Sequence, residues 1–207
     1  MSNLLLTMSR DESSACFWSS ALIGLITLGM NTIDDETRVS PSTLLLNLSV
    51  LWKGAHTVKS APATTPTEAL IVMPQTPTGN DTEFDNILDQ LTTAILDDTP
   101  PENHASYNAA IKHLRQAFAL SAVDNDGGGV LSWIACLSHS VLDEMRNAKP
   151  AACLLFTFYG AALHRLRGLW YVGEMGALLV AELTPTVSTK DKTLVTLVNW
   201  AREKVCS

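Results

Sequence analysis

Two small groups of residues have the types and the spacing that acid–base chemistry needs. His139 precedes Asp143 by four positions in a segment with helical periodicity, so the two side chains share a face and the carboxylate could orient the imidazole for proton transfer. Glu174 follows Trp170 by four positions in an apolar stretch, with Tyr171 as a second polar group. If Glu174 is buried, its pKa rises and it could serve as a general acid. The simpler interpretation of both groups is exposure to solvent.

The stretch FYGAALHRLRGLWYVGEMGALL, residues 158–179, is the main candidate for a ligand site. Its glycines at 160, 173 and 176 remove side-chain volume, which close helix packing explains most simply and space for a ligand explains alternatively. A pocket here would be apolar, with Tyr171 and Glu174 as its polar groups. The predicted ligand-binding residues are Phe158, Gly160, His164, Trp170, Tyr171, Gly173 and Met175.

The sequence predicts no metal site and no cofactor. Cys16, Cys136, Cys153 and Cys206 are scattered and lack the paired spacing of zinc ligands. Residues 124–127 begin like a calcium-binding loop, but the later positions of that motif do not follow. Isolated cysteines and an opening segment without a secretory signal predict an intracellular protein with reduced thiols.

Charge and hydropathy narrow the classes of partner. The 207 residues include 14 Lys and Arg against 21 Asp and Glu, a net charge of −7, which disfavours direct binding to nucleic acid. The longest apolar runs, 151–163 and 169–183, fall short of the roughly 20 residues that a membrane span needs. Charge and hydropathy therefore predict neither direct nucleic-acid binding nor a membrane span, and a homodimer is left open.

Helical periodicity dominates the chain. It predicts helices over residues 11–30, 41–57, 81–96, 99–118 and 130–147, and over the final segment 189–204. Pro150 in a first turn and Gly168 after a basic last turn predict one helix that ends near 167 and another that begins near 169. We expect one all-α domain over residues 1–207, an irregular bundle of seven to eight helices with a long loop at 59–81.

Several stretches, taken in order, resemble the C-terminal regulatory region of fungal binuclear-zinc-cluster transcription factors, especially the sterol-uptake-regulator group. They are CFWSSALIGLITLGM (16–30), LLLNLSVLWKGAHTV (44–58), YNAAIKHLRQAF (107–118), KPAACLLFTFYGAALHRLRGLWYVGEMGALLVAEL (149–183) and LVNWAREKV (197–205). The six-cysteine DNA-binding cluster of that family is absent from the sequence. Trp170-Tyr171 followed by Gly173-Glu174 also departs from the family's tryptophan and glycine pattern.

The resemblance implies a helical domain whose apolar pocket binds a sterol, terpenoid or polyketide. The expected function is therefore that of a hydrophobic-ligand-binding regulatory domain without its own DNA-binding module. The alternative is a cofactor-independent enzyme on the same scaffold, a cyclase or isomerase that folds a polyketide or terpenoid in its pocket. Such an enzyme would use Glu174, Tyr171, His139 and Asp143 for proton transfer.

Overall fold

A computed structural model describes residues 10–33, 39–59, 82–121, 127–187 and 191–206 of the chain. Every regular element within these ranges is helical, so the predicted all-α fold is confirmed. All but one residue of the predicted loop at 59–81 lie outside the described ranges, and Lys59 is the last residue of a helix.

The helices begin where the sequence supplies first-turn prolines and capping side chains. Pro41, Pro101 and Pro150 each occupy the first position of a helix, where the missing amide hydrogen costs nothing. The elements are α2 (Arg10–Ile33), α3 (Pro41–Lys59), α4 (Thr82–Asp98), α5 (Pro101–Ser121), α6 (Gly128–Leu131), α7 (Trp133–Cys136), α8 (His139–Arg146), α9 (Pro150–His164), α10 (Met175–Leu183), the 3-10 turn η2 (Thr184–Thr186) and α11 (Lys192–Cys206).

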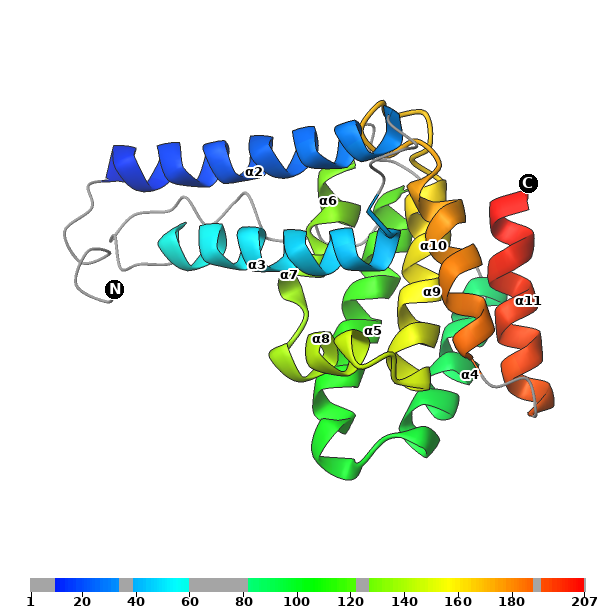
Figure 1. The fold of residues 1–207 in the computed structure, drawn as a ribbon. Helices are drawn as coiled ribbons and strands as arrows, with labels where there is room; N and C mark the ends of the chain where they lie inside the picture. The colour runs from blue at the N-terminus through cyan, green and yellow to red at the C-terminus, as the bar shows by residue number, and fades with distance from the viewer. Residues whose placement is uncertain (1–9, 34–38, 60–81, 122–126, 188–190, 207) are drawn as a thin grey trace.

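Helix α9 is the centre of the bundle (Figure 1). Every residue from 151 to 164 is buried, and α4, α5, α6, α8, α10 and α11 all pack against this helix. Two aromatic stacks hold it on opposite sides. Tyr159 stacks on Trp133 with ring centroids 4.3 Å apart, and Phe158 stacks on Trp200 at 4.9 Å. An uncharged helix of 15 residues is thus buried on all sides, as its composition requires.

The backbones of α9 and α10 meet at two glycines. A β-carbon at Gly176 would lie closer than 3.0 Å to the carbonyl oxygen of Gly160 and to the backbone of His164. The β-carbon of any other residue at Gly160 would press on Val180 and on the Gly176 carbonyl. Close helix packing therefore accounts for both glycines.

Helices α2 and α3 form an antiparallel pair that extends beyond the other helices (Figure 1). The indole of Trp52 on α3 lies against Gly24 of α2 so closely that no side chain fits there. A carboxylate from α10 holds the beginning of α3: Glu182 accepts the Ser42 amide at 3.0 Å and the Ser42 hydroxyl at 2.5 Å. A negative charge at a helix N-terminus is favourable because of the exposed amides and the helix dipole.

The predicted continuous helix over residues 130–147 is wrong. Leu137 is extended, with φ −66° and ψ 143°, and the segment divides into α6, α7 and α8. The break is stabilised from both sides. The Ser138 hydroxyl accepts the Val141 amide at 3.3 Å as the N-cap of α8, and the Lys53 ammonium donates to the Leu137 carbonyl.

The prediction that a helix begins near residue 169 is also wrong, because the helix begins later. Residues 165–174 form successive turns, and α10 begins only at Met175. Gly173, with φ 46°, adopts the left-handed conformation in this segment, whereas Gly168 does not. At the last helix, Asp191 supplies the cap by accepting the Thr193 amide at 2.8 Å.

The contact between α9 and α10 makes a direct prediction. Gly176→Ala should lower the free energy of unfolding by about 1–3 kcal/mol, because the new methyl group meets backbone atoms that cannot rotate away. Gly168→Ala is the matched control, since its β-carbon would have open space and its φ is not positive. Urea unfolding followed by circular dichroism measures both variants. Equal free energies of unfolding for Gly176→Ala and Gly168→Ala would contradict the close packing of α9 and α10.

Candidate functional site

The predicted pocket wall at 158–179 is largely packed. Phe158 is engaged with Trp200, and Gly160 accommodates α10 instead of leaving space for a ligand. His164 and Met175 are buried, Tyr171 and Gly173 are half-buried, and Trp170 is exposed. Burial and the nearby Arg167 lower the pKa of His164, and Glu174 opposes that shift. A ligand-binding role for these residues stays a prediction.

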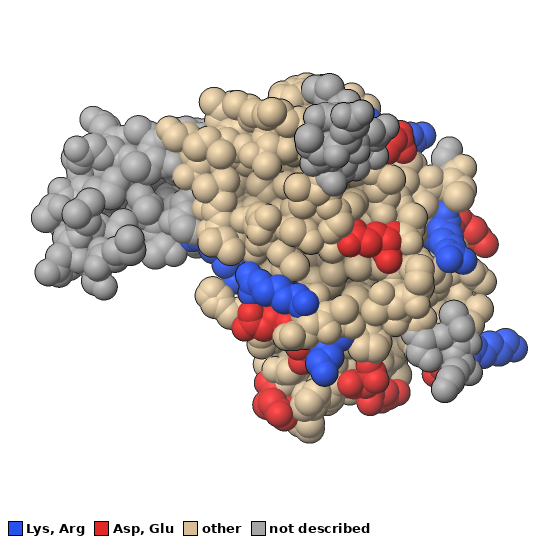
Figure 2. All heavy atoms as spheres, viewed as in Figure 1, with Lys and Arg blue, Asp and Glu red and all other residues tan. Residues whose placement is uncertain are grey.

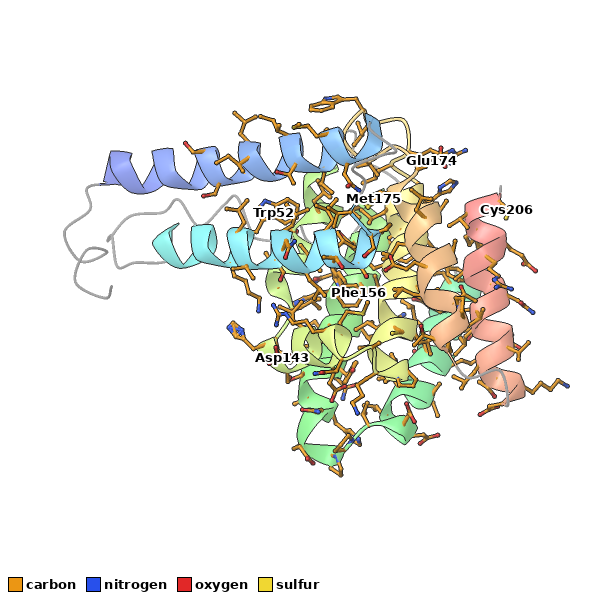
Figure 3. The ribbon with its side chains drawn as sticks, viewed as in Figure 1. Trp52, Asp143, Phe156, Glu174, Met175 and Cys206 are labelled. Atoms are coloured by element: carbon orange, nitrogen blue, oxygen red, sulfur yellow. The ribbon has the colours of Figure 1, made fainter. Side chains whose placement is uncertain are left out.

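The four acid–base candidates do not form one group. Glu174 is exposed, so it lacks the buried position that its predicted role as a general acid assumed. His139 is exposed at the start of α8, and Asp143 accepts from Arg146 at 2.6 Å. Figure 3 shows Asp143 near α8 and Glu174 above the start of α10, well apart from each other. The proton-transfer role of Glu174, Tyr171, His139 and Asp143 therefore has no assembled geometry among the described side chains.

A partly buried polar cluster that the sequence analysis did not identify joins α5 to α8. The carboxylate of Glu144 accepts the Tyr107 hydroxyl at 2.5 Å and the Asn103 side-chain amide at 2.6 Å. Tyr107 is completely buried, and this burial together with Glu144 raises the pKa of its hydroxyl. The phenol thus keeps its proton and acts as a donor. No local sequence signal links these residues, because they are 37 positions apart.

One hollow lies between the end of α4, the start of α9 and the start of α11. Its volume is about 260 Å³, and its apolar wall includes Ala94, Leu154 and Leu194, with Asp97 and Asp98 among its carboxylates. Pockets for drug-sized ligands usually measure about 300–1,000 Å³. A sterol would therefore not be enclosed by this hollow as it stands.

The most distinctive surface is the outer face of α2, which we define as Ser19, Leu22, Ile23, Ile26, Thr27 and Met30. Its four apolar side chains are exposed by 58, 54, 44 and 66% in chain order. The opposite side of α2 contributes Gly24, Leu25 and Leu28 to the contact with α3. The sequence predicts a helix over residues 11–30 without showing which of its sides the rest of the chain covers.

Spacing along this face follows a heptad pattern. Ser19, Ile23, Ile26 and Met30 are separated by four, three and four positions, the period at which one helix packs along another in a coiled coil. This spacing is visible in the sequence. The spacing alone does not show whether the helix that covers this face belongs to the same chain or to another molecule.

The outer face lies in an uncharged part of the surface. In Figure 2 the tan surface over the right-hand part of α2 shows no Lys, Arg, Asp or Glu, and the charged side chains lie mainly over the lower helices and toward the right-hand edge. Trp170 extends the apolar area: its indole lies on Gly29, and the residue is 65% exposed. A contiguous apolar surface without charges is a candidate site for contact with another molecule.

Comparisons with protein-family models, with curated proteins and with solved structures found no match. Among the described helices, none is both long and apolar enough to cross a bilayer. Within the same ranges, no three His, Cys, Asp or Glu side chains are grouped as metal ligands would be.

Two buried tyrosines allow a matched test of the cluster between α5 and α8. Tyr107→Phe should lower the free energy of unfolding by about 1.5–3 kcal/mol, because the hydroxyl donates to a carboxylate that stays behind. Tyr159→Phe should cost little or nothing, since its buried hydroxyl has no hydrogen-bond partner among the described atoms. Thermal and urea unfolding of both variants give the comparison. A larger loss of stability for Tyr159→Phe than for Tyr107→Phe would show that the hydrogen bonds to Glu144 do not stabilise the contact between α5 and α8.

Proposed function

We propose that this chain is a helical docking domain that binds a helix of a partner along the outer face of α2. The heptad spacing of exposed apolar residues on that face carries the proposal. Apolar side chains that recur at alternating intervals of three and four residues insert between the side chains of a neighbouring helix. On an uncharged face this contact is made by apolar packing. The partner helix is accordingly expected to be apolar on the side that docks.

The remainder of the fold supports this role by holding α2 at the edge of the molecule. Helix α3 covers one side of α2, and Glu182 and Lys53 tie α3 to α10 and to the end of α7. The docking face is thus presented on a fixed pair of helices. Helix-on-helix binding of this kind uses the same side-chain packing as the interior of a helical bundle.

The resemblance to fungal regulatory regions agrees with a docking role, since such regions act as parts of larger regulators.

Binding of a sterol, terpenoid or polyketide is a second candidate function. It is favoured by the apolar wall of the hollow that includes Ala94, Leu154 and Leu194, and it would require that hollow to widen. An intracellular location stays a proposal, with which the free thiols of Cys136, Cys153 and Cys206 agree.

A helical peptide with isoleucine and leucine at its heptad positions and charged residues elsewhere tests the docking function. The fluorescein-labelled peptide should bind the chain saturably, and Ile26→Lys should weaken binding at least about tenfold because it places a charge in the apolar contact. Val50→Lys, a change of the same charge at an exposed residue of α3, should leave binding unchanged. Fluorescence anisotropy measures all three proteins. Equal binding by both variants would refute docking at α2.

A further inference from the structure

We propose that the helix docked on the outer face of α2 is α2 of a second copy of this chain, in antiparallel orientation. The inference rests on the proposed docking function and names its partner. Four observations support a second copy: the distribution of charge, the size of the apolar area, the projection of the helical pair and the arrangement of large and small residues along the face.

Charge favours this face for self-association. Each copy carries a net charge of −7, so two copies repel wherever their carboxylates approach. Contact about a twofold axis places similar surfaces opposite each other. Residues 13–33 contain no charged side chain, whereas α4, α5, α8 and α11 all carry carboxylates. Two copies can therefore meet along α2 without facing like charges.

The apolar area is close to what a homodimer needs. Leu22, Ile23, Ile26, Met30 and Trp170 each expose between 44 and 66% of their surface. If aliphatic side chains of this size are near the lower end of the range of about 150–250 Å² that applies to aromatic ones, the exposed halves of the five side chains offer on the order of 500 Å² per copy. A standard interface uses about 800 Å² per partner, of which about 65% is apolar in homodimers. The patch therefore matches the apolar part of a standard interface.

The shape of the molecule leaves room for the second copy. Helices α2 and α3 extend beyond the other helices in Figure 1, so a helix laid along the outer face of α2 meets the α2–α3 pair before it meets the rest of the bundle. Pairing of two such helical pairs places the two α2 helices at the centre and the two α3 helices outside. The result is a layer of four helices in which only the two α2 helices cross the interface.

Residue sizes select the antiparallel orientation. With the contact centred between Gly24 and Leu25, Ile23 lies opposite Ile26 of the partner subunit, and the small Ser19 lies opposite the long Met30 of the partner subunit. A parallel pair would instead place serine on serine and methionine on methionine, which leaves a void at one end and crowding at the other. The antiparallel pair also brings opposite ends of the helix dipoles together.

Charge-swapped variants of the full chain test both the partner and the orientation. Sedimentation velocity from micromolar to submillimolar concentration should show the unchanged chain and Val50→Lys as dimers. Ile23→Lys and Ile26→Glu should each raise the dissociation constant at least about tenfold. Both changes are at exposed positions, and circular dichroism confirms that the variants keep their helices. An equimolar mixture of the two variants should recover dimers, because position 23 of one copy faces position 26 of the other.

Each contrary result has a defined meaning. An unchanged chain that stays monomeric while the heptad peptide still binds at α2 overturns the second copy as partner and leaves the docking function intact. A monomeric chain that also fails to bind the peptide removes both proposals. A dimer that both variants leave intact overturns α2 as the interface. A mixture that stays monomeric overturns the antiparallel pairing.

Discussion

The contact between the backbones of α9 and α10 at Gly160 and Gly176 is the constraint on which the other helices depend. Because neither position has room for a β-carbon, α10 lies directly on α9. Helix α9 is buried along its whole length, so it can exist only if helices cover it on every side. The position of α10 thereby fixes Glu182, whose carboxylate holds the first turn of α3. A chain of direct contacts thus runs from the buried centre to the exposed face of α2.

This arrangement also accounts for Gly160 and Gly176 in the segment 158–179 by close packing of two helices. Glycines in an apolar stretch are compatible with a cavity or with close packing, and the choice depends on what lies opposite. Here Gly160 and Gly176 lie opposite each other and exclude side-chain volume from the same place. The apolar surface that remains uncovered belongs instead to α2, which packs mainly on α3 and contacts the turns after α9 through Trp170.

Local patterns in the sequence predicted much of the fold. Apolar periodicity and first-turn prolines gave helices close to α2, α3, α4, α5 and α9, because these signals act within one or two turns. They failed at Leu137 and at 165–174, where the chain path depends on partners that are distant in the sequence. The Lys53 ammonium reaches Leu137 from a position 84 residues away. Neither the Tyr107–Glu144 bond nor the exposure of Ile23 and Met30 could be predicted from spacing alone, since both depend on which helix becomes the neighbour.

Hydrogen exchange of the unchanged chain at two concentrations tests the central claim most directly. If the outer face of α2 docks on a second copy while α9 is sealed inside the bundle, amides of residues 19–31 should exchange more slowly at the higher concentration. Amides of α9 should be strongly protected at both concentrations, because their exchange requires opening of the core. Exchange from α2 that is independent of concentration, or rapid exchange from α9, would contradict the account.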